Sequence, residues 1–249
     1  MKSVNSNLVQ EEPRMNLGHL QLLDNRAEEI KLFETSIKEK ARSVGKLEIL
    51  EAGCGRRWPI NLADIEYTLT GIDLDRTALE KRKTIQKDLD EIILGDLRKV
   101  DLPEGRYDVI YNSFVLEHIM GAEKVLWNFV QWLKPNGLMI LRFPDRDSIY
   151  GFFARISPFW FHVGYKKYIY GDKNAGKPGY GPYPTFYDSV ISRTGMRAFC
   201  ELAGLTIKSE YGIERLSGIQ QLCSQLVEVA SFGHLDSKHI NLGYILEKK

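Results

Sequence analysis

The segment 47–55 (Leu-Glu-Ile-Leu-Glu-Ala-Gly-Cys-Gly) joins a short apolar run to a glycine-rich turn. Glycine at positions 53 and 55 lets the backbone of such a turn approach a ligand closely. Asp73 ends a second apolar run, twenty positions after Gly53. A carboxylate at that place can accept hydrogen bonds from the hydroxyl groups of a ribose. Together these two features predict a nucleoside site.

Two further apolar runs also end in polar residues. Asp96 ends the run 91–96, and its carboxylate can accept from the exocyclic amine of adenine or cap the turn that follows. Asn112 and Ser113 end the run that starts at 107. Because open α/β sheets bind ligands at the carboxyl ends of their strands, all four strand ends are expected to face one crevice.

A glycine-rich turn after a strand also occurs in dinucleotide-binding proteins. Their third glycine allows a helix to pack closely, and backbone N–H groups bind the pyrophosphate. Here Trp58 and Pro59 stand near that point, and proline has no N–H to donate. The turn therefore favours a nucleoside ligand without phosphates, and a nicotinamide-dependent oxidoreductase is disfavoured.

The apolar periods along the chain predict the elements that position these residues. Strands are expected at 46–51, 67–73, 91–96, 107–112, 138–143, 205–209 and 242–246, and helices at 17–44, 76–87, 122–133, 192–203 and 218–229. Ser192 and Gly204 are expected to cap the fourth of these helices. Strands that alternate with helices at this spacing indicate an α/β fold, with a mostly parallel sheet covered by helices on both faces.

The motifs at the strand ends resemble those of the class I S-adenosylmethionine-dependent methyltransferases. The segments 47–55, 69–75 and 95–97 are similar to the first, second and adenine-binding motifs of that family. The segment 108–118, with 132–137 after it, is similar to the fourth- and fifth-strand motifs of its small-molecule branch. The resemblance covers residues 45–143 most clearly, and Arg57 departs from it where many members carry a third glycine.

The resemblance implies a Rossmann-like sheet of seven strands, the last antiparallel, that binds S-adenosyl-L-methionine. The residues that it assigns to this cofactor are Glu51, Gly53, Cys54, Gly55, Asp73, Leu74, Asp96, Leu97, Asn112 and Ser113. Glu51 either shapes the loop or holds the methionine amine. Cys54 is expected to contact the cofactor through its backbone, because nothing near it indicates a lowered thiol pKa.

Two histidines are candidates for a general base. His118 lies just past the fourth predicted strand, near the place where methyl donor and acceptor should meet. Histidine is well suited to take a proton near neutral pH, although a structural or orienting role for His118 is an equal alternative. His162, among aromatic residues further along, is the second candidate.

The segment 144–190 is crowded with aromatic residues and shows no regular period, so we expect an irregular insertion after the fifth strand. An aromatic lining suits a pocket for a small, partly apolar methyl acceptor. Two alternatives stay open. The aromatics can form a local core or a homodimer interface. With Lys166 and Lys167 beside Trp160, they also suit peripheral contact with a membrane surface.

Composition limits the remaining classes of function. The 249 residues carry a net charge of +1, which gives no overall field to attract nucleic acid. The chain contains no apolar run of about 18–20 residues, and its three cysteines are too far apart to suggest a zinc site. We therefore expect a cytoplasmic enzyme with no metal, no nucleic-acid partner and no integral membrane segment.

The expected organisation is a single methyltransferase domain, 1–249. Within it, residues 1–20 are a flexible leader or a lid, 45–143 the cofactor-binding core, 144–190 the acceptor-binding insertion and 191–249 the completion of the sheet. The predicted reaction is methyl transfer to an O or N atom of a small metabolite by direct displacement at the sulfonium methyl. The alternatives are a methyltransferase for RNA or protein, and a non-catalytic partner protein with the same fold.

Overall fold

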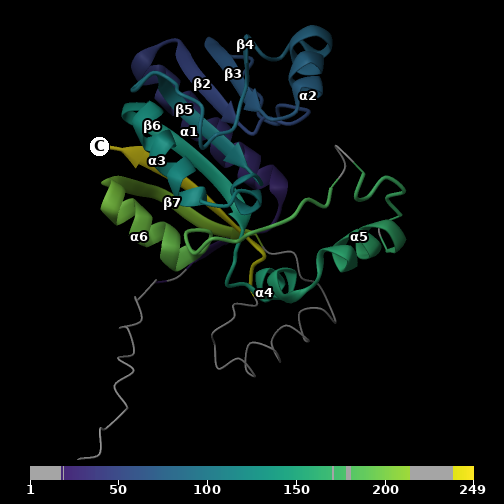
Figure 1. The fold of residues 1–249 in the computed structure, drawn as a ribbon. Helices are drawn as coiled ribbons and strands as arrows, with labels where there is room; N and C mark the ends of the chain where they lie inside the picture. The colour runs from purple at the N-terminus through teal and green to yellow at the C-terminus, as the bar shows by residue number, and fades with distance from the viewer. Residues whose placement is uncertain (1–17, 19, 170, 178–180, 214–237) are drawn as a thin grey trace, which may run out of the picture.

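The computed structural model describes residues 18, 20–169, 171–177, 181–213 and 238–249. In these residues an eight-stranded sheet runs in the order β1-β7-β8-β6-β5-β2-β3-β4 (Figure 1). Its strands are β1 (Gln21–Leu23), β2 (Leu47–Ala52), β3 (Tyr67–Asp73), β4 (Glu91–Leu94), β5 (Tyr107–Ser113), β6 (Leu133–Pro144), β7 (Leu205–Ile213) and β8 (Asn241–Lys248). Only β8 runs antiparallel to its neighbours, β6 and β7. The Rossmann-like α/β class expected from the sequence is confirmed.

Helices cover both faces of the sheet, as the alternation of strands and helices predicted. On one face α1 (Arg26–Val44) buries Phe33 and Ile37 against β2, β5 and β6. On the other face α3 (Ala122–Trp132) and α6 (Arg193–Ala203) pack with the opposite sides of the same strands. The side chains of a strand alternate between faces, so β2 contributes to both of these cores.

The first helix starts later than the sequence predicted. Residues 21–23 form β1, which pairs in parallel with β7 and adds the eighth strand. The helix begins after Asn25, whose side chain accepts hydrogen bonds from the N–H groups of Ala27 and Glu28 at 2.9 and 3.1 Å. The leucines before Asn25 match a helical period by chance, and the capping asparagine decides the boundary.

The predicted caps of the α6 helix are confirmed. The Ser192 hydroxyl accepts from the N–H of Gly195, and Gly204 adopts a φ of 66°. After α2 (Arg76–Lys81), residues Arg82–Gln86 form one turn of π-helix, η1, within the predicted helix 76–87. The predicted helix 218–229 and the leader 1–17 lie outside the described residues.

The prediction of an irregular insertion was wrong for the part of the segment that two helices occupy. They are α4 (Ile149–Ile156), which follows the capping Ser148, and α5 (Phe159–Tyr168). Gly151 is the single buried residue of α4, and α5 has none. Both helices are short, with 8 and 10 residues, and a short run rich in aromatic residues does not by its period distinguish a helix from other structure. No helix among the described residues is long and apolar enough to cross a membrane.

Candidate cofactor-binding and catalytic site

The glycine-rich turn is fixed between the ends of β2 and β3. The N–H groups of Gly53 and Cys54 donate to the carbonyl of Ile72 at 2.8 and 3.1 Å. Gly53 has a φ of 75°, and a Cβ there would lie 2.4 Å from Cγ2 of Val115, so the turn requires glycine. At Gly55 a Cβ would meet nothing within 4 Å, so open space lies in front of the turn.

A buried arginine that the sequence analysis missed holds the backbone of this turn and the Glu51 side chain before it. Arg82, on η1, has a fully buried side chain whose Nη1 donates to Oε2 of Glu51 at 2.6 Å and to the carbonyl of Cys54 at 2.8 Å. Its other nitrogens donate to Asp88. Glu51 itself is only 3% exposed. This arrangement favours the loop-shaping role for Glu51 over contact with a methionine amine.

Asp73 lies beside the turn, and its carboxylate has hydrogen-bond acceptor positions that the described residues do not use. Its Oδ2 accepts from the N–H of Gly55 at 2.8 Å and its Oδ1 from the N–H of Asp75 at 2.9 Å. A carboxylate offers about four acceptor positions, so hydroxyl groups of a ribose can still bind. Next to it the Leu74 side chain is 73% exposed, which suits contact with a flat apolar ring.

Asn112 adds a second observation that fits a bound nucleoside. Its Nδ2 donates to the carbonyl of Ala52 at 2.8 Å, while its fully buried Oδ1 has no hydrogen-bond partner among the described residues. Such an oxygen is costly unless a ligand or water satisfies it. With Asp73, Leu74 and the open space at Gly55, the strand ends fit the adenosine part of S-adenosylmethionine.

Two of the predicted cofactor contacts have other partners in this structure. The Asp96 carboxylate accepts from the backbone N–H of Arg98 and from its guanidinium, the shortest contact being 2.6 Å. These bonds use most of its acceptor capacity, so an adenine amine would have to displace Arg98. The Leu97 side chain is in the hydrophobic core, and its carbonyl accepts from Asn128. The adenine contacts of Asp96 and Leu97 remain predictions.

The pair of Asp96 and Arg98 gives a prediction about stability. Hydrogen bonds from Arg98 lower the pKa of Asp96 to about 2. A lowered carboxyl pKa stabilises the fold above the unfolded value of about 4, and this stability is lost as the pH falls from about 4 to about 2. We expect Asp96→Asn to lower the free energy of unfolding by about 1 kcal/mol at pH 7, because the pair is partly solvated. Urea unfolding at pH 5 and at pH 3 measures the difference in the free energy of unfolding between variant and wild type. This difference should be smaller at pH 3, and equal differences at the two pH values would contradict the pairing of Asp96 with Arg98.

Cys54 and Ser113 are placed as supporting residues of the site. Cys54 is buried, and burial raises the pKa of its thiol to about 12, which leaves its backbone as the part that can meet a ligand. The Ser113 hydroxyl lies 3.4 Å from Nη1 of Arg142, a buried arginine at the end of β6. Nη2 of Arg142 is 2.8 Å from Oε2 of Glu29 on α1, so an ion pair ties the first helix to these strand ends.

His118 is held in a defined orientation at the end of η2 (Leu116–His118). Its Nδ1 is 2.8 Å from the carbonyl oxygen of Pro184, so Nδ1 carries the proton of the neutral ring and Nε2 keeps its lone pair. Burial lowers the pKa of His118, an effect that the Pro184 carbonyl partly opposes. The ring therefore stays neutral at pH 7. The Tyr183 ring packs edge-on against it at 5.7 Å.

A buried carboxyl group adjoins this histidine, and the sequence analysis did not identify it. Glu117 is 2% exposed, and its Oε1 lies 3.8 Å from Nε2 of His118. Burial raises the pKa of Glu117 to about 8. Glu117 is thus mostly neutral at pH 7 and does not stabilise a charged His118 in the resting state.

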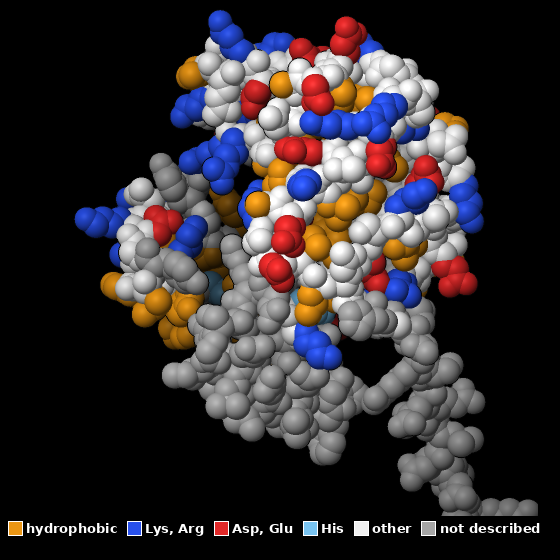
Figure 2. Space-filling model, turned by 180° about the vertical axis from the view of Figure 1, so that it is seen from behind, with side chains coloured by type: hydrophobic (Ala, Val, Ile, Leu, Met, Phe, Trp, Pro, Cys, Tyr) orange, Lys and Arg blue, Asp and Glu red, His pale blue; other side chains and the backbone are white. Residues whose placement is uncertain are grey.

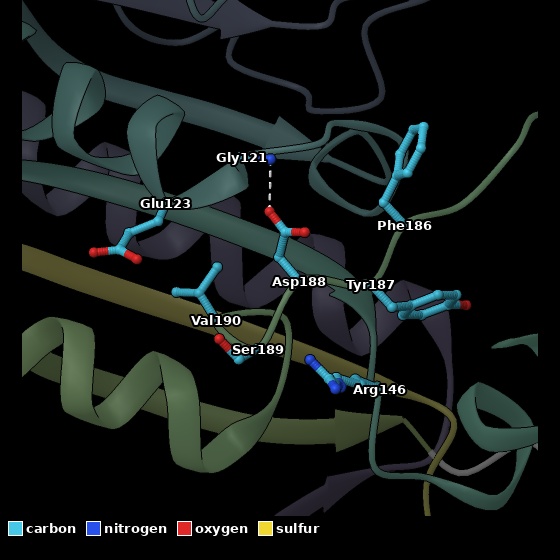
Figure 3. A pocket seen from close by; sticks show the side chains of 8 residues that line it. All are labelled: Gly121, Glu123, Arg146, Phe186, Tyr187, Asp188, Ser189 and Val190. Carbon is cyan, nitrogen blue, oxygen red and sulfur yellow. Dashed lines mark hydrogen bonds between the residues drawn. The ribbon is translucent and has the colours of Figure 1, made fainter.

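The end of the aromatic insertion runs across η2 and the start of α3. The N–H of Phe186 donates to the carbonyl of Glu117 at 2.8 Å, and Oδ2 of Asp188 accepts from Gly121 and Ala122 at 2.7 and 2.8 Å. Figure 3 shows Asp188 directed at Gly121, beside a cavity of about 420 Å³. None of the predicted cofactor residues lines this cavity, so it is distinct from the predicted cofactor site. The segment 184–188 links the insertion to His118.

His162 is placed apart from this arrangement. It lies on α5, which Figure 1 shows projecting away from the sheet, and its ring packs edge-on against Phe161 at 6.3 Å. The structure thus brings His118, but not His162, to the strand ends that carry Asp73 and Asn112. A catalytic role for His162 stays a prediction.

Comparisons with known proteins agree with this geometry. The model of the methyltransferase domain family matches residues 18–210. A probable S-adenosylmethionine-dependent methyltransferase of Mycolicibacterium smegmatis is 29% identical over 100 residues, which are 40% of this chain and 38% of that protein. A ubiquinone biosynthesis O-methyltransferase of Rickettsia akari is 31% identical over 111 residues, 43% of this chain and 44% of that protein. The chain thus covers less than half the length of these curated relatives.

A solved structure shows the same fold over nearly the whole chain. The S-adenosylmethionine-dependent methyltransferase of Mesorhizobium loti aligns with a TM-score of 0.52 and 15% identity, over 86% of this chain and 96% of that one. Identity this low supports the fold alone, whereas the family model matches well over half of the sequence. From its matched residues and its strand-end site, the chain belongs to the methyltransferase domain family, the class I enzymes whose cofactor is S-adenosyl-L-methionine.

Proposed function

We propose that the chain transfers a methyl group from S-adenosylmethionine to an oxygen or nitrogen atom of a small, partly apolar metabolite. The observation that carries this proposal is the state of His118: neutral, oriented through Nδ1 and with a lone pair on Nε2. A base of this kind can take the proton of a hydroxyl or ammonium acceptor. The O-methyltransferase name of the Rickettsia relative supports oxygen as the acceptor atom.

When bound, the cofactor supplies an electrophilic methyl group on a sulfonium centre. The chain's own residues align the reactants and remove a proton. Asp73 and the turn at Gly53 hold the nucleoside, and alignment alone is worth up to about 7–11 kcal/mol in well-oriented reactions. His118 accepts the acceptor's proton at Nε2, and its Nδ1–H bond to Pro184 then steadies the charged ring. The aromatic segment that ends at Phe186 supplies apolar surface and excludes water beside it.

Binding and transfer assays test this function in two stages. Calorimetry should detect binding of S-adenosylmethionine and S-adenosylhomocysteine, with NAD as a negative control. Transfer of a tritiated methyl group to a panel of phenols, amines and lipophilic metabolites then identifies the acceptor class. Label that appears only in an RNA or protein fraction would show a macromolecular substrate. Absence of cofactor binding would indicate a non-catalytic protein with this fold.

Asp73→Ala tests the cofactor site itself. We expect the affinity for S-adenosylhomocysteine to fall by about 1–3 kcal/mol, because the ribose loses its carboxylate acceptor and Gly55 loses its support. Asp75→Ala is the matched control, since Asp75 carries the same charge but caps α2 through Thr77 and Ala78. That variant should lose stability and keep its affinity. Equal affinities in calorimetry for Asp73→Ala and the wild type would overturn the assignment.

A further inference from the structure

Helices α4 and α5 present an unusual amount of apolar surface to solvent. Eight large side chains on these helices are between 44% and 78% exposed: Tyr150, Phe153, Ile156, Phe159, Trp160, Phe161, Tyr165 and Tyr168. We call them the α4–α5 surface. In Figure 2, hydrophobic side chains gather along the lower side of the lobe at the left, with Lys and Arg side chains nearby. Exposed apolar patches of this kind mark contact sites for a protein or a membrane.

The net charge of the segment that carries this surface indicates which kind of partner it can bind. Residues 149–177 contain five Lys or Arg residues and one acidic residue, a net charge of +4, whereas the whole chain has a net charge of +1. The rest of the chain is therefore acidic overall. Asp172 lies 3.4 Å from Lys166 and partly neutralises it, while Nζ of Lys167 lies 5.6 Å from the ring centre of Tyr168. Apolar and cationic groups are thus concentrated together in one part of the molecule.

This combination disfavours a second copy of the chain as the occupant. A two-fold symmetric contact through the α4–α5 surface would place the same lysines of both copies near one another. Like charges brought together at an interface cost free energy. A negatively charged surface above an apolar layer, as in an anionic bilayer, suits both the cationic and the apolar side chains. Lysine and arginine side chains reach the charged headgroups, while aromatic rings enter the boundary below them.

We propose that the α4–α5 surface docks on an anionic lipid bilayer. Trp160 and Phe159 insert at the boundary between headgroups and acyl chains, and Lys167, Lys173 and Arg155 contact the anionic headgroups. The segment that follows contacts His118 through the Pro184 carbonyl and Glu117 through the N–H of Phe186. Docking therefore places the site close to the bilayer. It does not depend on the proposed methyl transfer, since no cofactor or acceptor takes part in it.

Vesicle sedimentation of the full chain, without cofactor, tests the proposal. Binding should be strong on vesicles of phosphatidylcholine with phosphatidylglycerol and weak on phosphatidylcholine alone, and it should fall as salt is added. The double variant Lys167→Glu/Lys173→Glu should bind the anionic vesicles at least about tenfold more weakly, because each cation near the surface contributes. Trp160→Ala should also weaken binding. The tryptophan emission of the wild type should shift when vesicles are added, because the Trp160 ring enters the bilayer boundary. In Trp160→Phe this shift should disappear while binding persists.

Matched variants on other faces serve as controls. Lys99→Glu/Lys124→Glu makes the same charge change, and Leu202→Ala removes a side chain that is 75% exposed on α6. Both should bind vesicles like the wild type. Circular dichroism and S-adenosylhomocysteine binding confirm that each variant folds. Equal binding to neutral and anionic vesicles, or equal losses in the control variants, would overturn the proposal. So would a dimer in solution that Trp160→Ala dissociates.

Discussion

His118→Ala should lower kcat by about 100-fold or more, because general-base catalysis contributes that much when a proton must be removed. The expectation depends on the neutral ring, whose Nδ1 is bound by the Pro184 carbonyl and whose Nε2 keeps its lone pair. Steady-state kinetics with the acceptor found by tritium transfer measures the effect. Because burial lowers the pKa of His118, the acid limb of kcat/KM should lie below pH 6.5.

The alternative, that His118 only orients the neighbouring segment, needs its own variant. In His118→Asn the side-chain amide still donates to Pro184 but has no basic lone pair. If His118 is the base, this variant loses activity like the alanine variant and loses the acid limb of the pH profile. If His118 is structural, activity returns in His118→Asn. The matched control is His162→Ala, which should change kcat by less than a few-fold.

Arg82→Met should lower the free energy of unfolding by about 3 kcal/mol, because it leaves the Glu51 carboxyl buried without its partner. Methionine keeps much of the volume of the fully buried side chain, so the loss reports mainly on the ion pair. Burial raises the pKa of Glu51, and Arg82 opposes that rise. Without Arg82 the carboxyl takes up a proton as the pH falls, so the loss should be smaller at pH 5 than at pH 8.

Urea unfolding measures the loss in the free energy of unfolding for Arg82→Met and for the control variant Arg76→Met. Arg76 precedes it on the same helical stretch, has a 69% exposed side chain and lies 3.7 Å from Glu80. Exposed pairs of this kind contribute between zero and about 1 kcal/mol. A loss for Arg82→Met no larger than that for Arg76→Met would show that the buried pair does not hold the turn. Weaker binding of S-adenosylhomocysteine is expected in Arg82→Met as well, because Arg82 also holds the Cys54 carbonyl.

The sheet was predictable from the sequence because strand pattern and turn chemistry agree there. Strands 67–73 and 107–112 were placed to within one residue, since apolar runs end sharply at polar residues. β1 could not be predicted in the same way. It has three residues, and its pairing with β7 at Tyr211 depends on chain almost two hundred residues away. The two helices of the insertion escaped detection because each is short and rich in aromatic residues, so the apolar period is ambiguous there.

At the candidate site the motifs identified the residues that face the ligand and missed those behind them. Asp73 and Asn112 end predicted strands, so their place at the sheet edge followed from topology. Arg82 has two charged or polar neighbours in a helical stretch that looks solvent-exposed in sequence, yet its side chain is fully buried. Arg98, which competes for Asp96, has a similarly ordinary context. The pair of Arg82 and Glu51 joins residues 31 positions apart and leaves no local pattern in the sequence, whereas Arg98 stands only two positions from Asp96 and was not considered as its partner.

The two ends of the aromatic insertion are joined to each other. The N–H of Arg146 donates to the carbonyl of Ile191 at 3.0 Å, and Asp145 is bound in turn to Ile240. The residues between form a loop that is closed at its base and is also bonded to η2 and α3 through 184–188. The free energy of closing a flexible loop changes by only about 0.6 kcal/mol when its length doubles. We therefore expect that changes in the length of this loop leave the cofactor turn intact. On the prediction that this insertion binds the acceptor, acceptor preference can change without any change in the sheet.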